Sequence, residues 1–195
     1  MGFGAQFYVN YSINCALFPN DDEILSLNPK FYLDDLPMVI IFYYREFFMS
    51  KNKEFYKIVE NWAYNKGFKV EMKQNGHNTI CFEAFYITIN ASQGAENRLF
   101  SLLHECGHIL LCQDEKRYKE AFPGVWNGIQ DKRRSRGRFF RVSLVEEEMM
   151  AWNEGLKLAK RLGVNINEDK WNKHKTDCLY TYLRWAVITV GMVHE

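Results

Sequence analysis

The chain has 195 residues, of which 47% are hydrophobic, 16% aromatic and 25% charged. This length is enough for one domain that buries about two-thirds of its unfolded surface, and the composition excludes a chain that is disordered throughout. The formal net charge of +1 excludes a strong whole-molecule field, so any electrostatic signal must be local. We expect a single domain over residues 1–195, with a mostly helical part at 1–66 and the remainder of the fold at 67–195.

The cysteines predict reduced thiols rather than a disulfide framework. Their odd number leaves at least one unpaired, and none forms a Cys-x-x-Cys pair. The N-terminus lacks the basic and apolar regions of a secretory signal. The apolar stretch at 185–193 is far shorter than the roughly 20 residues that cross a bilayer. These features predict a cytoplasmic protein without a membrane segment. The five thiols are Cys15, Cys81, Cys106, Cys112 and Cys178.

The first part of the chain reads as an irregular segment followed by helix. Residues 1–30 contain turn formers, among them Asn28-Pro29. A helical pattern then runs from about 34 to 66, and one interpretation divides it into two helices near 50–52. Gly67 is well placed to end this segment.

A strand pattern follows the helix. Apolar residues alternate with lysine and glutamate over 68–72, which is the period of a half-exposed strand. Asn75-Gly76 is a strong hairpin-turn signal. We therefore expect a return strand through 79–82 that continues to 87–89.

The second half is predicted to be helical. Helices are expected at about 95–112, 144–162 and 177–190, and a connection of roughly thirty residues with short structure separates the first two. The order of helices, hairpin and further helices predicts an α+β fold.

The motif that carries chemistry is His104-Glu105-Cys106-Gly107-His108, an HExxH pattern on a predicted helix. Histidines four residues apart lie one above the other on a helix, so their imidazoles can bind one cation. Zinc suits imidazole and carboxylate ligands, and an open coordination position makes such a site catalytic. Glu105 is predicted to act on a metal-bound water without being a ligand itself.

Helical phase supports a metal site on one face of this helix. Ser101, His104, Glu105 and His108 lie opposite an apolar stripe. We expect the stripe to anchor the helix in the core while the motif faces a cleft, in preference to a merely solvated polar face. Cys106 lies on the stripe, which predicts a buried, unreactive thiol. The stripe consists of Leu99, Leu102, Leu103, Cys106, Ile109 and Leu110.

A third ligand must come from another segment. The extended motif HExxHxxGxxH needs Gly at 111 and His at 114, where the chain has Leu111 and Asp114. Without the glycine bend, the helix should carry Asp114 away from the metal. The better source is Glu146-Glu147-Glu148, some forty residues downstream.

Helical phase selects Glu148 among these three acids. Glu147 is predicted to point away from the buried stripe and Glu146 to lie well off it, as expected for solvated acids near a helix N-terminus. Glu148 borders the stripe next to Ala151 and Gly155, whose small size would let two ligand helices approach closely. Glu148 is therefore the predicted third ligand, and Glu147 the next candidate. The predicted stripe consists of Val145, Met149, Trp152, Leu156 and Ala159.

These residues also carry a family resemblance. The HECGH sequence followed by Glu148-Met-Met-Ala151 resembles the gluzincin pattern of HExxH with a later ExxA on a second helix. Within that group the chain is similar to ImmA/IrrE-type metallopeptidases and related small phage and bacterial proteins. The similarity covers about 79–162, including the strand before the motif helix, which in zincins aligns the substrate. The resemblance implies a small zincin-like domain and cleavage of a protein partner, often a regulator.

A basic segment lies between the two predicted ligand helices. It could bind nucleic-acid phosphates or an acidic substrate, but the near-neutral chain favours a solvated loop. Its position also makes it a candidate lid, and we expect it to be dispensable for folding. The six cations are Lys132, Arg133, Arg134, Arg136, Arg138 and Arg141, with Phe139 and Phe140 among them.

The oxyanion-stabilising residue is left open. Zincins often use a His, Tyr or Arg for this role, and the chain offers His174, Tyr180 and Tyr182. The two tyrosines also fit ordinary core positions, so none of the three is selected.

The residues together predict zinc-dependent hydrolysis of a peptide bond in a protein substrate. Zinc held by His104, His108 and Glu148 would lower the pKa of its bound water towards about 7. Glu105 would take the proton and deliver it to the leaving amine. Zinc follows from ligand chemistry, and the peptide substrate follows from the resemblance. The alternative is a non-enzymatic zinc-containing interaction protein that binds a host or regulatory partner, or nucleic acid through 132–141.

Overall fold

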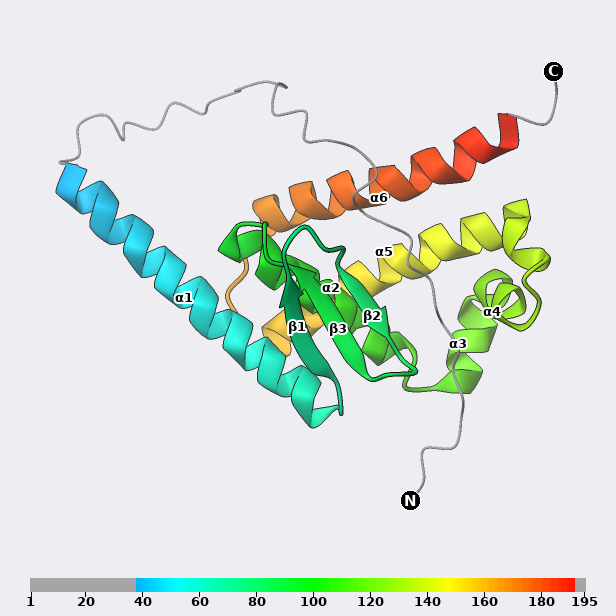
Figure 1. Ribbon diagram of the computed structural model, residues 1–195, viewed down its shortest axis with the longest axis horizontal. Coiled ribbons are helices and arrows are strands. Elements are labelled where there is room, and N and C mark those ends of the chain that lie inside the picture. Colours follow the sequence, from blue (N-terminus) through cyan, green and yellow to red (C-terminus); the bar gives the residue numbers. More distant parts are fainter. Residues whose placement is uncertain (1–37, 192–195) are drawn as a thin grey trace.

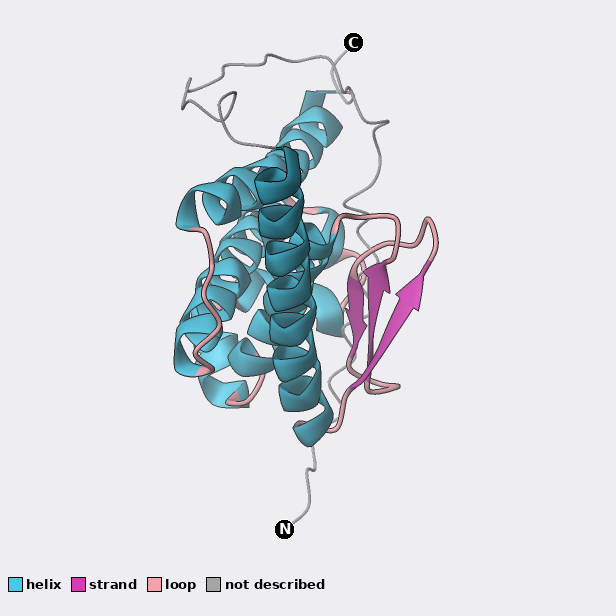
Figure 2. Cartoon of the chain, turned by 90° about the vertical axis from the view of Figure 1, so that its left-hand side faces the viewer, coloured by secondary structure: helices cyan, strands magenta, loops and turns pink. Residues whose placement is uncertain are grey.

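Helices dominate the structure, and a small sheet lies on one side of them (Figures 1 and 2). The computed structural model describes residues 38–191, and the side chains of 51–187. The fold is α+β, as predicted, and the irregular start predicted for 1–30 lies outside the described residues. In chain order the elements are α1 (Met38–Asn65), β1 (Lys69–Lys73), β2 (Thr79–Cys81), β3 (Tyr86–Asn90), α2 (Ala95–Leu111), α3 (Glu115–Ala121), α4 (Pro123–Gln130), the 3-10 turn η1 (Arg134–Arg136), α5 (Arg138–Arg161) and α6 (Glu168–Gly191).

The α1 helix is continuous through 50–52, so the predicted break there is wrong. It ends where the sequence indicates, at Gly67, which has a φ of 92°. The Gly67 N–H donates to the Tyr64 carbonyl and the Phe68 N–H to the Ala63 carbonyl. This pair of bonds is the Schellman arrangement, which glycine permits because it lacks a Cβ.

The sheet has the order β1-β3-β2, so the predicted hairpin between 68–72 and 79–82 is wrong. Asn75-Gly76 does form a turn, with an Asn75 φ of 51°. After this turn, β2 does not pair with β1. The place beside β1 in the sheet is taken by β3, which runs parallel to β1. The hairpin joins β2 to β3 instead, and Phe85 in its turn has a φ of 52°.

The burial of β3 explains this order. Ile87, Thr88 and Ile89 are all buried, so this strand is covered on both faces. In β1, by contrast, Lys69 and Lys73 are exposed, as suits an edge strand. The turn dipeptide indicated a reversal of the chain, but the order of the strands follows from which of them can be buried on both sides.

The α2 helix occupies the centre of the fold. It contacts α1, α5, α6, β2 and β3, and every residue from Leu99 to Ile109 is buried. The predicted bounds of this helix are confirmed within a residue, and Cys106 is buried as predicted. The polar face carrying His104 and His108 is therefore enclosed by α5 rather than open to solvent.

Two helices begin earlier than the sequence pattern indicated. The α5 helix starts at Arg138 rather than near 144 and so includes part of the basic segment. The α6 helix starts at Glu168 rather than near 177. Its start is marked by Asn167, whose Oδ1 accepts the Lys170 N–H at 3.0 Å. Asparagine is a favoured N-cap, so this signal was present in the sequence.

Among the described residues, Cys81, Cys106, Cys112 and Cys178 are free thiols. No helix in the described part of the chain is both long and apolar enough to cross a bilayer.

Small residues let α2 and α5 approach closely. A Cβ at Gly107 would clash with the carbonyl of Ala151, and a Cβ at Gly155 would lie 2.5 Å from the Leu103 carbonyl oxygen. The sequence anticipated this approach at Ala151 and Gly155.

We expect Gly155→Ala to lower the free energy of unfolding by about 1–3 kcal/mol, because the added methyl group forces the two backbones apart. This loss should appear in denaturant titration even though alanine has the higher helix propensity. The control is Lys157→Ala, on the exposed side of the same helix. A more stable Gly155→Ala protein would show that the two helices do not pack as described.

The basic segment is not a uniform loop. Arg133 and Arg134 pair with Asp131, at 3.2 and 3.8 Å. Arg141 is half-buried on α5, where its Nη1 donates to the Ala186 carbonyl at 3.5 Å and its guanidinium lies 5.5 Å from the ring centre of Trp185. The segment therefore has an exposed part and a part that packs against α6.

Replacing the exposed Arg133, Arg134 and Arg136 by serine should change the free energy of unfolding by no more than about 0.5 kcal/mol. Arg141→Ser should lower it by about 1 kcal/mol, because a partly desolvated cation–π contact and the stem packing are lost. Thermal denaturation of the two variants compares them directly. Equal losses of stability in the two variants would contradict the division of the basic segment into an exposed part and a packed part.

Candidate metal centre

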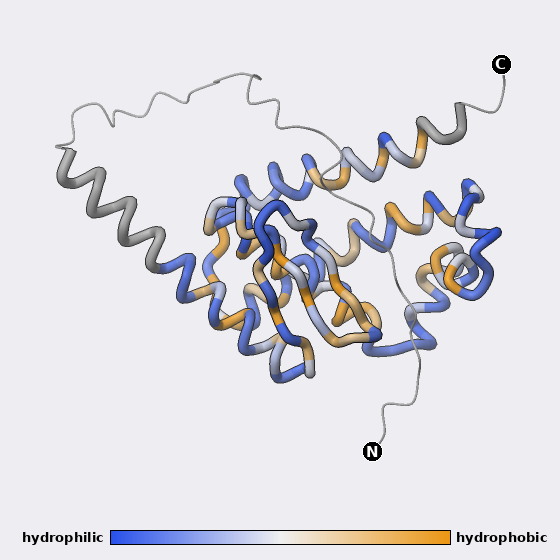
Figure 3. Tube along the Cα trace, in the orientation of Figure 1, coloured by the Kyte–Doolittle hydropathy of each residue, from blue (hydrophilic) through white to orange (hydrophobic). Residues whose placement is uncertain are grey.

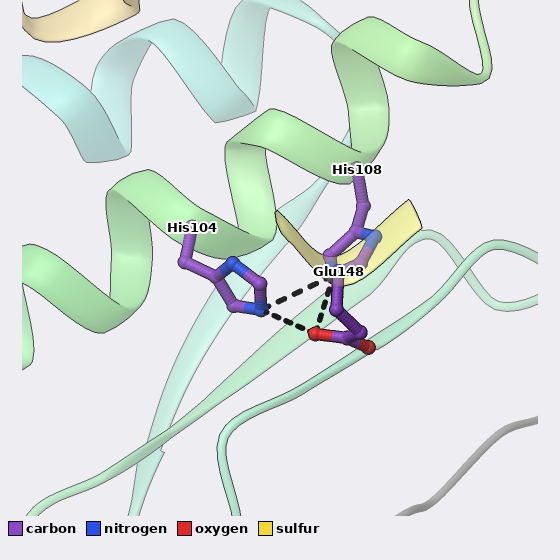
Figure 4. Close-up of side chains that lie close together, drawn as sticks. All are labelled: His104, His108 and Glu148. Carbon is purple, nitrogen blue, oxygen red and sulfur yellow. Dashed lines mark hydrogen bonds and ion pairs between the residues drawn. The ribbon is translucent and has the colours of Figure 1, made fainter. Parts of the chain in front are cut away.

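Two histidines of α2 and one glutamate of α5 bring three ligand atoms together (Figure 4). His104 Nε2 lies 3.2 Å from His108 Nε2 and 3.2 Å from Glu148 Oε2. The distance from His108 Nε2 to Glu148 Oε2 is 3.8 Å. All three residues are buried. They form the one group within the described residues whose ligand atoms are placed to hold a metal ion.

These separations suit a tetrahedral ion. Zinc bonds of about 2.0–2.1 Å at tetrahedral angles place ligand atoms roughly 3.3 Å apart. Two imidazole nitrogens and one carboxylate oxygen are also a donor set of catalytic zinc sites, in which the fourth position stays open. Glu148 Oε2 is buried and has no hydrogen-bond partner among the described residues. A cation at this point would satisfy that oxygen, so the three residues fit a zinc ion.

Glu147 takes a different place from Glu148. The His108 Nδ1–H donates to Glu147 Oε1 at 2.9 Å. A carboxylate at Nδ1 keeps the proton there, so a metal ion that displaces the proton from Nε2 would meet a lone pair directed at the other ligand atoms. Glu147 thus orients a proposed ligand, whereas the sequence pattern predicted it only as an alternative ligand.

The outward orientation predicted for Glu147 is wrong, because the buried face of α5 differs from the predicted stripe. Val145 and Leu156 are only half-buried, and Met149 is 43% exposed. The observed face includes two carboxylates and small residues, so hydrophobicity alone misplaces it. Its members are Phe140, Ser143, Leu144, Glu147, Glu148, Ala151, Trp152, Gly155, Leu158 and Ala159.

Two aromatic side chains support the ligands. The Trp152 ring stacks on the His104 ring at 4.3 Å between centroids, with an interplanar angle of 18°. The Tyr182 hydroxyl of α6 hydrogen-bonds the Glu148 carboxylate. The sequence pattern predicted this role for neither residue, although Trp152 lies four residues after Glu148 and so shares its helix face.

The charges around His108 favour a cation at the site. Burial by itself lowers the pKa of His108, but the carboxylates of Glu147 and Glu148 outweigh it and raise the pKa to about 10. Burial likewise raises the pKa of Glu148, and the positive charge of His108 and the adjacent His104 ring bring it below its ordinary value. The carboxylates therefore hold positive charge between the two helices.

Glu105 is close to the ligands without belonging to them. It is buried, and burial raises the pKa of its carboxyl above the ordinary value, against the opposing effect of His104 and His108. Such a shift brings a carboxylate nearer to the pKa of a general base that works at neutral pH.

A small cavity connects these groups. Its volume is about 50 Å³, which is room for a few water molecules because each needs roughly 10–15 Å³ of such space. Strand β2 forms one side of it. The lining residues are Asn78, Thr79, Ile80, Phe82, His104, Glu105, His108, Cys112, Tyr118, Leu144, Glu147, Glu148 and Tyr182.

The other candidate residues lie elsewhere. The Asp114 side chain accepts the Arg117 N–H as the N-cap of α3. Tyr180 is largely exposed and His174 packs on Phe100, whereas Tyr182 lines the cavity.

Residues 132–141 do not line the cavity, so the structure gives the lid interpretation no support. Tyr118, for which the sequence pattern predicted no role, does line it.

We find no protein-family model, curated protein or solved structure that matches this chain significantly. The gluzincin resemblance therefore rests on the motif residues alone, and the interpretation of the site rests on its geometry.

Three consecutive glutamates should give three different zinc affinities. We expect one zinc ion per chain, lost in Glu148→Ala because two imidazoles and solvent hold zinc poorly near neutral pH. Glu147→Ala should bind zinc about 10–100-fold more weakly, as is typical when the hydrogen-bond partner of a ligand is removed. Glu146→Ala, which alters an exposed side chain, should bind as the wild type does.

Competition with a chelating dye measures all three affinities, and His104→Ala and His108→Ala serve as ligand-loss references. Full zinc retention in Glu148→Ala would rule out this residue as the third ligand. Complete loss in Glu147→Ala with retention in Glu148→Ala would exchange the roles of the two residues.

Proposed function

We propose that the protein is a zinc-dependent metallopeptidase of the zincin type that hydrolyses a peptide bond in a protein substrate. The observation that carries the proposal is the position of Glu105 in the same cavity as His104, His108 and Glu148. A structural zinc site is closed by four protein ligands. Three ligands with a fourth acidic side chain beside them are instead the components of a hydrolytic site.

Glu105 is the proposed general base. Zinc, when bound, supplies the Lewis acidity that lowers the pKa of water towards about 7. Glu105 accepts the proton as the water attacks the carbonyl carbon, and then donates it to the leaving amine. The raised pKa of Glu105 suits both steps, because the carboxyl must hold the proton between them.

The surrounding residues position these groups. Glu147 keeps the proton of His108 on Nδ1, and Trp152 fixes the plane of the His104 ring. The Tyr182 hydroxyl lines the cavity and donates its one proton to the Glu148 carboxylate, so its proposed role is to hold that ligand in place. Tyr180 and His174 lack this access to the cavity.

A peptide substrate is supported by the edge of the sheet. Strand β2 pairs with β3 on one side and with no described strand on the other. Its residues Thr79 and Ile80 line the cavity. An extended peptide can add to such an edge through main-chain hydrogen bonds, which would bring a backbone carbonyl to the cavity mouth. The zincin resemblance implies that the strand before the motif helix aligns the substrate; here that strand, β3, is central, and the proposal assigns the edge to its neighbour β2.

Glu105→Gln should keep zinc and lose hydrolysis. The amide has nearly the shape of the carboxylate but cannot accept a proton, so the rate should fall by about 10²–10⁴. A mixture of fluorescence-quenched peptides provides the activity measurement, and chelator competition provides the zinc affinity. Glu146→Gln is the matched control and should retain both properties.

This experiment also separates the proposal from its alternative. Unaltered turnover in Glu105→Gln would exclude the mechanism. Zinc binding without cleavage of any peptide by the wild type would favour a non-enzymatic zinc-containing interaction protein.

A further inference from the structure

An apolar groove lies between α5 and α6, and it shares no lining residue with the cavity at the metal centre. Its volume is about 620 Å³. Three of its aliphatic side chains are strongly exposed: Val142 by 58%, Leu183 by 48% and Val187 by 69%. Figure 3 shows apolar positions on both helices in this region. The lining residues are Arg138, Arg141, Val142, Val145, Glu146, Leu183, Ala186 and Val187.

The spacing of these side chains suits a helical occupant. Val142 and Val145 are three residues apart on α5, and Leu183 and Val187 are four apart on α6. Each pair therefore forms a ridge on its own helix. Two parallel ridges with a groove between them accept the apolar face of a third helix, whose side chains recur at the same spacing.

The charges at one end of the groove specify the occupant further. Arg138 and Arg141 line the groove against a single acid, Glu146. The first turn of α5 has no acidic residue and no side-chain cap, although the N-terminus of a helix is the end that favours negative charge. Arg141 Nε is buried without a hydrogen-bond partner among the described residues. Carboxylates from a partner would pair with the exposed Arg138 and with the solvent-facing part of the half-buried Arg141.

The neighbouring η1 turn extends the basic surface. The one described acid that pairs with it is Asp131, which contacts Arg133 and Arg134. Lys132 and Arg136 are exposed and form no ion pair among the described residues. A basic surface that continues into an aliphatic groove is not suited to nucleic acid alone, because phosphate contacts need no such groove.

We propose that this groove is a docking site for an acidic amphipathic helix of a partner protein. The apolar face of that helix contacts the valines and Leu183, and its carboxylates pair with Arg138 and Arg141. The inference is independent of the zinc chemistry, because none of the groove residues is a proposed ligand or the proposed base.

The test measures the binding of short labelled peptides to the full-length protein by fluorescence anisotropy. The probes are synthetic amphipathic helices with leucines at helical spacing and glutamates on the flanks, and matched peptides carry lysine in place of glutamate. We expect the acidic peptides to bind in preference to the basic ones, and more weakly as salt is raised.

Variants of the groove separate its two components. The double variant Val142→Ser and Val187→Ser should weaken binding by about tenfold or more, as for central interface residues. Arg138→Glu should weaken the acidic peptides and improve the basic ones. The controls are Tyr64→Ser, an exposed apolar position on α1, and Arg161→Glu, at the other end of α5. Neither control should change the affinity.

Several results would overturn the proposal. One is no binding by any acidic peptide, or equal binding by the basic set. Another is binding of a single-stranded oligonucleotide that Arg138→Glu weakens and the double valine variant leaves unchanged. This result would assign the surface to nucleic acid. A third is a wild-type dimer in sedimentation that the double valine variant dissociates, which would assign the groove to a second copy of the chain.

Discussion

Burying ionisable side chains between two helices carries a large desolvation penalty, and the structure is organised around offsetting it. Glu147 and Glu148 of α5 are buried against His104 and His108 of α2. Unpaired, such charges would destabilise the fold by several kcal/mol each. Here each carboxylate lies within ion-pair distance of an imidazole, and a bound cation would complete the compensation.

This requirement explains the surrounding packing. The ligand side chains of the two helices meet only if the backbones are close, and Gly107 against Ala151 and Gly155 against Leu103 permit that approach. The α2 helix must then be covered on its remaining sides, which α1, the sheet and α6 accomplish. The small sheet thus has two consequences: it buries α2, and it places the edge strand β2 beside the cavity.

The sequence predicted the parts of this arrangement that depend on local spacing. Histidines four apart on a helix must share a face, and Ala151 and Gly155 indicated a close approach near Glu148. The bounds of α2 and the glycine end of α1 are local signals of the same kind. The α6 start was missed although Asn167 offered a cap signal.

The remaining features depend on tertiary contacts. The orientation of Glu147 was misjudged because the buried face of α5 is partly polar, and hydrophobicity cannot find a face that is buried through hydrogen bonds. The strand order was misjudged because β3 competes with β2 for the place beside β1, and only burial on both faces decides that competition. The roles of Trp152 and Tyr182 likewise require distances between separate helices.

The stacking of Trp152 on His104 has an optical consequence. The indole is stacked 4.3 Å from the imidazole of a proposed ligand, so one ring separates it from an ion that this ligand would hold. Emission from this ring would be quenched by ions with partly filled d shells, such as cobalt, and left largely intact by zinc, whose d shell is full. If the site holds a metal as proposed, the part of the emission that comes from Trp152, one of five tryptophans, would report which metal is bound without an added dye.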